Sequence, residues 1–251
     1  RRVLFRSKMI GLNASGIYGV TFFFGTLILI SQRAISNIST TIIVESWKID
    51  DLKTIAEIYT KSSINQFIIG VLVFIGIWGN IENVFHLLQP EYADGRWVIF
   101  FISLSNLVTV LSGVAIYILA TSKYYRYGMW FMLFLIVLVV VTNLIFIPIW
   151  GVTGAAFASF ISMLSYTLFA CIFLYHKFKI QPLRTNHLGI AAAGIATYFL
   201  STLLPTFSNF VVDIAVRSSL IISLFGIMII VLRSSDEINA MVTKYLKILR
   251  K

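Results

Sequence analysis

The sequence predicts an all-α protein, a polytopic transmembrane helix bundle of about seven spans. Its composition is the first reason, because 59% of the 251 residues are hydrophobic and only 12% are charged. Soluble domains carry about 25% charged residues, so this chain cannot enclose its apolar side chains in one water-facing globule. The second reason is a series of apolar runs of membrane-spanning length. The third is that Lys and Arg gather in alternate connections between those runs.

Seven apolar runs follow one another along the chain, and each is expected to form a membrane span. They are Leu12–Val44, Ile64–Leu88, Trp97–Ala120, Met129–Phe146, Gly154–Tyr175, Leu188–Leu204 and Val211–Leu232. The first is followed by the longest expected loop, Glu45–Lys61. In that loop Leu52, Ile55, Ile58 and Tyr59 recur at helical spacing behind Asp50, which is a candidate N-cap. This pattern predicts a short amphipathic helix lying on the membrane surface.

The fourth and fifth spans are expected to form a tight hairpin. Pro148 has no N–H to donate and should end the incoming helix, and Gly151 supplies the backbone freedom of the turn. Gly154, Ala158 and Ser162 then repeat at four-residue spacing, which leaves one face of the outgoing helix almost without side chains. In lipid such a face lets two helices approach closely. We therefore expect it to pack against a neighbouring span.

The basic connections predict the orientation. Segments 45–61, 122–127, 176–187 and 233–251 contain 3, 2, 3 and 5 Lys or Arg, whereas 89–96, 148–152 and 205–213 contain only Arg96. The positive-inside rule places the first set, and the C-terminus, in the cytoplasm. This distribution also explains the net charge of +10 without a nucleic-acid partner.

The two ends of the chain call for separate predictions. Residues 1–7, Arg-Arg-Val-Leu-Phe-Arg-Ser, match the translation of a common sequencing adapter, so we interpret them as an artefact preceding the true protein. The tail 234–251 repeats an amphipathic pattern, with Ile238, Met241, Val242, Tyr245 and Leu249 on one face. A basic helix of this kind is expected to lie on the anionic lipids of the inner leaflet.

Polar residues inside the spans are the candidates for a substrate path. Thr26, Arg33, Asn37 and Thr40 share one face of the first span, with Arg33 about ten residues before the end of that span at Val44, or roughly 15 Å deep. An intramembrane arginine often faces a wet cavity. The alternative is an Arg33 that snorkels to the headgroups. Asn106 of the third span is a further candidate for the path, although an interhelical hydrogen bond is its ordinary role.

No catalytic constellation or metal site is expected. His86, His176 and His187 are scattered along the chain, and Cys171 is the single cysteine. Glu82 lies near the outer boundary with Asn80, Asn83 and His86, where an interfacial polar cluster is expected. We therefore expect neither a cofactor nor an enzymatic activity.

Several short motifs, in their order and spacing, resemble the polysaccharide flippases of the multidrug/oligosaccharidyl-lipid/polysaccharide exporter superfamily. They are Gly16-Ile17-Tyr18 at a span start, Pro90-Glu91-Tyr92-Ala93 in an outer loop, and Pro148-x-x-Gly151-x-x-Gly154-Ala155-Ala156 between two spans. The runs Ser122–Tyr127 and Lys179–Pro182 are similar to versions in Bacteroidetes-type bacteria. A departure is the end of the first span, Ile38–Ile42, which lacks the proline of many relatives.

The resemblance implies the C-terminal half of a two-lobe, MATE-like transporter in the bacterial inner membrane. Residues 8–175 would supply the five spans of the second lobe, residues 176–233 two additional spans, and an N-terminal lobe would precede them. The implied activity is flipping of an undecaprenyl-diphosphate-linked oligosaccharide by alternating access, with Arg33 facing the diphosphate. The alternatives are a drug/cation antiporter of the same superfamily, or a polyprenyl-linked membrane glycosyltransferase or polymerase. An antiporter needs buried carboxylates, and such an enzyme needs acids or a large loop at the membrane surface.

Overall fold

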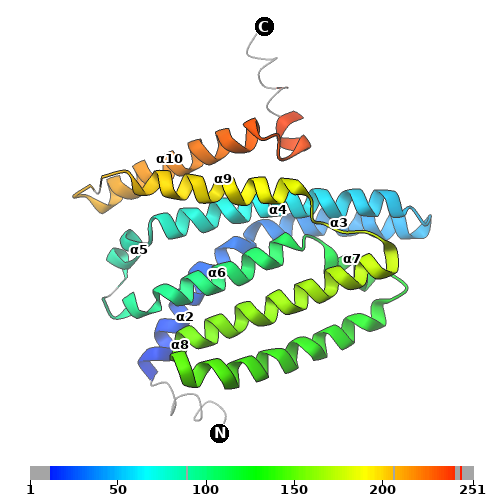
Figure 1. Cartoon of the computed structure of the whole chain (residues 1–251), viewed down its shortest axis with the longest axis horizontal. Coiled ribbons are helices and arrows are strands. Elements are labelled where there is room, and N and C mark those ends of the chain that lie inside the picture. Colours follow the sequence, from blue (N-terminus) through cyan, green and yellow to red (C-terminus); the bar gives the residue numbers. More distant parts are fainter. Residues whose placement is uncertain (1–11, 89, 206, 241–243, 245–251) are drawn as a thin grey trace.

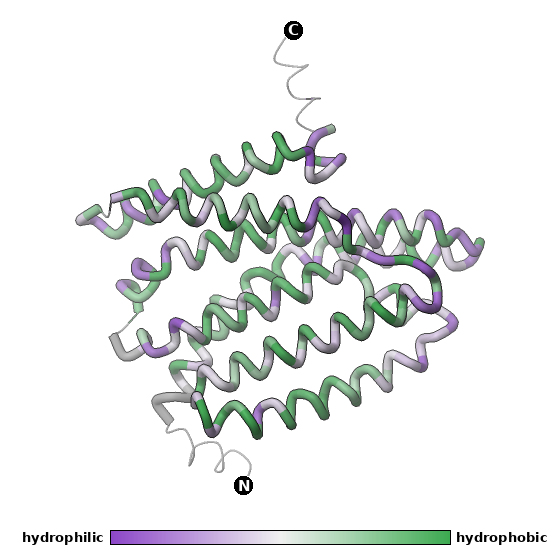
Figure 2. Tube along the Cα trace, viewed as in Figure 1, coloured by the Kyte–Doolittle hydropathy of each residue, from purple (hydrophilic) through white to green (hydrophobic). Residues whose placement is uncertain are grey.

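The computed structural model describes residues 12–88, 90–205, 207–240 and 244. Within these ranges the chain is helical and contains no strand. The helices lie side by side, with the two limbs of α8 at one edge of the bundle and α9 and α10 at the other (Figure 1). Hydrophobic residues fill the lengths of the helices, and hydrophilic residues gather towards their ends (Figure 2). The predicted adapter-derived segment 1–7 lies outside the described residues.

The first span is continuous but changes its winding. It consists of α2 (Leu12–Thr26), the 3₁₀ turn η1 (Leu27–Leu29) and α3 (Ile30–Lys48). A turn of three residues then leads into α4 (Leu52–Gly79). The predicted loop 45–61, with a surface helix inside it, is therefore wrong. Ile55 and Tyr59 are fully buried, so the amphipathic pattern there is that of a helix packed inside the protein.

The N-cap of α4 is Asp51, one residue later than predicted. Its carboxylate accepts a hydrogen bond from the backbone N–H of Thr54 at 3.1 Å and another from the Thr54 hydroxyl at 2.6 Å. Asp50 instead adopts a left-handed conformation, with φ of 52°. The cap and the turn together reverse the chain within three residues.

The second and third predicted spans are each divided. After α4, the short helix α5 (Ile81–Leu87) and the 3₁₀ segment η2 (Pro90–Gly95) lead to α6 (Arg96–Leu111) and α7 (Ala115–Thr121). Gly113, between α6 and α7, has φ of +55°. A Cβ on Gly113 would lie 2.9 Å from both the Ser62 hydroxyl and the Ser63 nitrogen. Glycine thus permits both the break and its close packing on α4.

The predicted hairpin of the fourth and fifth spans is formed by α8 (Tyr125–Phe178). The chain reverses its direction within α8 at Gly151, where φ is 57° and ψ is −129°. Pro148 does not end the incoming limb, because the helix continues to Trp150. A Cβ on Gly154 would overlap the Phe146 carbonyl oxygen of the opposite limb. The predicted close approach at the small-residue face is confirmed, and its partner is the other limb of the same hairpin.

The chain ends with α9 (Thr185–Thr202), α10 (Phe210–Val231) and a helical stretch over residues 236–240. Of the apolar tail face, only Ile238 lies among the described side chains, and it packs against the core. Met241, Val242, Tyr245 and Leu249 lie outside the described residues.

Five of the described helices are long and apolar enough to cross a membrane: Gly16–Lys48, α4, Tyr92–Leu111, α8 and α10. α8 folds back on itself at Gly151 and therefore supplies two limbs. α9, with 18 residues, is not among the five. The protein is a helical bundle with the character of a membrane-embedded protein. Its expected count of seven spans stays a prediction.

The Lys- and Arg-rich connections lie at one end of the bundle, which we call the basic end. It contains the α3–α4 turn, the α7–α8 turn and the α8–α9 linker, at the right of Figure 1, and the residues after α10, which follow the end of α10 that is nearer to that side. The α5–α6 connection, the turn at Gly151 and the α9–α10 loop lie at the opposite end. The alternation seen in the sequence thus corresponds to the two ends of the folded chain.

Candidate functional site

The predicted path residues of the first span lie on or near the surface of the bundle. Arg33 and Asn37 are exposed, and Thr26 and Thr40 are half-buried. The hydroxyl of Thr26 donates to the Phe23 carbonyl at 2.7 Å, and that of Thr40 donates to the Ser36 carbonyl at 2.6 Å. Within the described ranges, neither the Arg33 guanidinium nor the Asn37 amide has a hydrogen-bond or ion-pair partner.

The polar surface of α3 continues towards the basic end. Thr41, Glu45 and Lys48 are also exposed, so polar residues recur every three or four positions from Arg33 to the end of the helix. This spacing keeps them on one side of α3. In the other direction the exposed residues become apolar, with Ile30 68% and Phe23 66% exposed. The polar stripe is therefore confined to α3.

Asn106 does not join this stripe. Its side-chain amide donates to the Gly25 carbonyl at 2.9 Å and so ties α6 to α2. Gly25 lies just before the 3₁₀ turn, whose tighter winding gives the chain an extra rotation between Thr26 and Arg33. The structure brings Arg33, Asn37 and Thr40 together on α3 and separates Asn106 from them.

The packing of α3 on α4 gives the level of Arg33. A Cβ on Gly70 would lie 3.4 Å from Ile28, and Ile43 shares a core cluster with Ile55. Interpolation between these two levels puts Arg33 at about the level of Asn65. Lys61 is one turn, about 6 Å, nearer to the basic end. Arg33 therefore lies about one helical turn from the level of Lys61, a charged residue of the neighbouring helix.

The buried side of α3 is also polar, which was not predicted from the sequence. Ser36, Ser39 and Ser46 are buried on α3, and Thr60, Ser62, Ser63 and Gln66 are buried on α4. Small polar residues suit close packing of helices in lipid. Gln66 has no exposed surface, and neither atom of its amide has a partner among the described residues. The run of serines in both segments was the available signal.

A buried ion pair lies at the opposite end of the bundle and was also missed. Arg217 Nε lies 3.3 Å from Asp213 Oδ2, and both side chains belong to α10. Asn83 of α5 donates to the same carboxylate at 2.5 Å, and Arg217 donates to the Ser201 carbonyl of α9 at 2.7 Å. The i,i+4 spacing of Asp213 and Arg217 was the available signal, because it pairs opposite charges on a helix. The group fastens α9 and α10 to α5.

His187 joins four segments near the basic end. Ser63 donates to the Leu111 carbonyl at 2.5 Å, so His187 Nε2, 2.9 Å from the Ser63 hydroxyl, must carry the hydrogen of that contact. Nδ1 then accepts from the Arg184 N–H at 3.1 Å. Burial lowers the pKa of His187, and donation from the protonated ring to the Arg184 carbonyl, 3.1 Å from Nδ1, opposes that shift. His187 therefore has a structural role, because it joins α9 and the linker before it to α4.

The remaining ionisable candidates do not assemble into a reactive site. Glu82 forms an exposed ion pair with Arg96, whereas Asn80 and Asn83, which were expected to share a cluster with it, are buried and contact Ser218 and Asp213 of α10. Cys171 lies 3.5 Å from the Tyr59 hydroxyl. In the described part of the chain, no group of three or more His, Cys, Asp or Glu could hold a metal ion.

Comparison of the chain with models of known protein families, with curated proteins and with solved structures found no match.

Proposed function

We propose that this protein flips an undecaprenyl-diphosphate-linked oligosaccharide across the bacterial inner membrane. The polar stripe of α3 would form part of the wall of the translocation path, and the C-terminus would lie in the cytoplasm. The motifs described above are one support. The physical support is a single observation: in a membrane-length helix, the side chains of Arg33 and Asn37 are exposed and have no partner among the residues that the structure describes.

An exposed charge in a membrane-length helix needs a polar neighbour. Intramembrane ionisable residues face a bundle interior or a water-filled cavity, because hydrocarbon cannot solvate them. α4 already covers the serine side of α3, so the stripe requires water or a second helical body on the other side. A second lobe facing α3 would enclose a polar path between the two, which alternating access requires.

The chemistry of the cargo fits a guanidinium at this place. A diphosphate carries several anionic oxygens, and arginine binds such groups through two parallel N–H···O bonds. The position of Arg33, one turn inside Lys61, corresponds to the level at which a lipid-linked diphosphate enters the hydrocarbon. Asn37 and Thr40 would add hydrogen-bonding groups for the sugar.

The rival transport function is weaker. A cation antiporter needs carboxylates that can bind and release a cation. The buried carboxylate of α10 is Asp213, and its oxygens already accept hydrogen bonds from Asn83, Arg217 and the Phe207 N–H. A membrane glycosyltransferase or polymerase needs acids or a large loop at the membrane surface. The replacement of the predicted 45–61 loop by helix leaves even less room for one.

The test is translocation by the product of the complete gene. We expect its expression in a strain that lacks its own oligosaccharide flippase to restore surface polysaccharide. Inverted vesicles from these cells should move a labelled undecaprenyl-diphosphate oligosaccharide to the lumenal leaflet. Correct insertion with no restored polysaccharide and no movement of labelled lipid would refute the proposal.

A further inference from the structure

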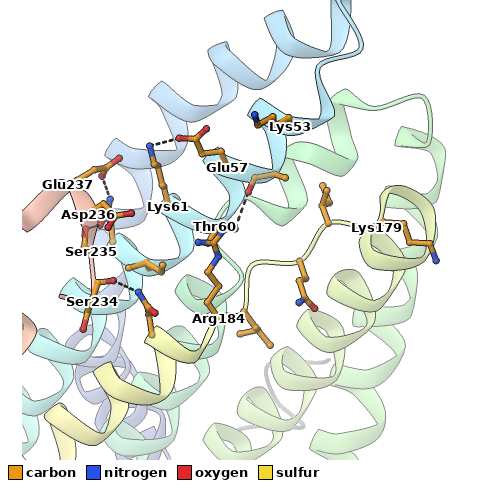
Figure 3. Close-up of a pocket in the computed structure, with 17 residues that line it drawn as sticks. Lys53, Glu57, Thr60, Lys61, Lys179, Arg184, Ser234, Ser235, Asp236 and Glu237 are labelled. Atoms are coloured by element: carbon orange, nitrogen blue, oxygen red, sulfur yellow. Dashed lines mark hydrogen bonds and ion pairs between the residues drawn. The ribbon is translucent and has the colours of Figure 1, made fainter. Parts of the chain in front are cut away.

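A pocket with separated charges lies at the basic end (Figure 3), and its lining includes no residue of α3. Its volume is about 580 Å³, within the usual range of ligand pockets. The first turns of α4 form its floor, the linker before α9 forms one wall, and the residues after α10 form the other. Arg184 extends from the linker wall towards Thr60 on the floor, and Asp236 and Glu237 stand on the opposite wall.

Three of the pocket's four cations and one of its three acids have no hydrogen-bond or ion-pair partner among the described residues, although one of these cations, Lys179, lies over the Tyr175 ring, 5.4 Å from its centroid. Lys61 on the floor is neutralised by Glu57, at 2.6 Å. Glu237 accepts a hydrogen bond from Asn65. In the described ranges, the Lys53 ammonium, the Arg184 guanidinium and the Asp236 carboxylate have no hydrogen-bond or ion-pair partner, and Asp236 interacts with Lys61 only through the electrostatic field. The pocket therefore presents free positive charge at the floor and linker, and free negative charge at the wall after α10.

The pocket lies at the level where the chain passes from charged to apolar sequence. After Lys61, the next charged residue of the chain is Glu82, about 30 Å further along, which is the thickness of a hydrocarbon core. After Arg184 no Asp, Glu, Lys or Arg follows until Asp213, and α10 has none between Arg217 and its end. All three elements thus place the pocket at the depth of lipid headgroups.

We propose that this pocket binds the phosphoethanolamine headgroup of a membrane phospholipid. The phosphate would lie against Arg184 and Lys53, since guanidinium and ammonium groups bind phosphate oxygens with charge-assisted hydrogen bonds. The primary ammonium of the lipid would donate hydrogen bonds to Asp236, because a carboxylate only accepts. A purely anionic headgroup brings no cation to Asp236. A choline headgroup has no N–H to donate.

Retention of lipid by the purified full chain tests this assignment. The protein is exchanged into mixed micelles with equal amounts of phosphatidylethanolamine and phosphatidylcholine, and bound lipid is counted by native mass spectrometry. The two lipids have the same net charge, so their ratio isolates the hydrogen bonds of the ammonium. We expect phosphatidylethanolamine to be retained about fivefold over phosphatidylcholine, the size of one interfacial charge contact.

Variants of the two walls should act differently. Arg184→Gln with Lys53→Gln should lower retention of both lipids, by about fivefold for each basic residue removed. Asp236→Asn should abolish the preference for phosphatidylethanolamine while both lipids are still retained. Lys123→Gln with Lys177→Gln is the matched control, because it removes two exposed cations from the same end outside both the pocket and the stripe of α3 and should change nothing. Because Asp236→Asn changes only the ratio between lipids, it tests the site even where the double variant folds poorly.

Three outcomes would overturn the proposal. They are equal retention of the two lipids by the unaltered protein, stronger retention of phosphatidylglycerol than of phosphatidylethanolamine, and equal losses in the pocket and control variants. Soluble phosphoethanolamine is added in a separate arm. Saturable binding of it that displaces no phospholipid would assign the pocket to a soluble phosphate ester and reject the lipid. None of these measurements depends on transport, so they stand apart from the proposed flippase activity.

Discussion

Thr142 and Ser162 face each other across the hairpin of α8, with their hydroxyl oxygens 2.9 Å apart. Both side chains are buried, and the Thr142 hydroxyl also lies 3.4 Å from the Ala158 carbonyl. One residue of the incoming limb thus reaches two residues of the small-residue face on the outgoing limb. The approach is this close because Gly154, Ala158 and Ser162 leave little side-chain volume between the limbs. In lipid, such packing replaces the hydrophobic drive for helix association.

Ala158→Leu should therefore destabilise the protein. Ala158 has no exposed surface, so the larger side chain must push the two limbs apart, at a cost of about 1–3 kcal/mol. Thermal unfolding in detergent and the yield of folded protein measure the effect. Ala192→Leu is the matched control, because Ala192 is exposed on α9 and should tolerate the change. Unchanged thermal stability in Ala158→Leu would contradict the packing described here.

Replacing one member of the buried Asp213–Arg217 pair should destabilise the protein more, per substitution, than replacing both. Asp213→Ala leaves Arg217 buried without its counter-charge, which costs about 3–5 kcal/mol. Asp213→Ala with Arg217→Leu should cost less than the sum of the two single changes, because no isolated charge remains. Unfolding of the four proteins in one detergent gives the comparison. The control is Glu82→Gln, whose exposed ion pair with Arg96 should contribute about 0–1 kcal/mol. Additive losses at Asp213 and Arg217 would mean that they do not act as a pair.

His187 predicts a loss of stability in mild acid. Burial holds the pKa of His187 below its ordinary value near 6.5, so the unfolded chain takes up the proton first as the pH falls. The contribution of neutral His187 is fully present above about pH 6.5 and is lost as the pH falls from there towards the folded-state pKa. His187→Gln should flatten the pH dependence of the unfolding temperature between about pH 7 and 5. His176→Gln, an exposed histidine at the same end, should leave it unchanged. A slope that persists in His187→Gln would show that other groups cause it.

The sequence was most informative where local chemistry decides the structure. The apolar runs located the long helices, and Gly151 located the reversal of the chain, because the required positive φ suits glycine. The sequence was misleading where one periodic pattern suits two different structures. The pattern of Leu52, Ile55 and Tyr59 suits a helix on a membrane surface and equally a helix packed on neighbouring helices. Only tertiary contacts decide between the two, and here they bury Ile55 and Tyr59 completely.

The polar contacts were harder to foresee because they join residues far apart in the chain. Asn106 meets Gly25, Ser63 meets His187, and Asn83 meets Asp213. None of these pairs has a local spacing that would reveal it. The exposed side of α3 is different, because the one-sided spacing of Arg33, Asn37 and Thr40 is visible in the sequence alone. The packing of α3 on α4 added the level of Arg33.

That level makes Arg33→Lys the decisive substitution for the proposed path. If Arg33 binds diphosphate oxygens through its fork of N–H groups, lysine should reproduce the contact poorly, and Arg33→Lys should impair transport. Arg33→Ala should nearly abolish it. Both variants should reach the membrane at normal levels, because losing a charge from a span does not hinder insertion. Flipping of labelled lipid in inverted vesicles gives the measurement. The control is Arg126→Ala, at an exposed arginine in the first turn of α8.

The alternative reading of Arg33 predicts the opposite for lysine. An arginine at about the level of Asn65, one turn from Lys61, could also snorkel to the headgroups, and a lysine snorkels equally well. Arg33→Lys would then transport normally, and Arg33→Ala would lose only anchoring at the interface. Full activity of both variants at normal expression would therefore remove Arg33 from the path. The exposed polar stripe would then mark the part of α3 that emerges from the hydrocarbon, because a helix needs polar side chains where water and headgroups begin.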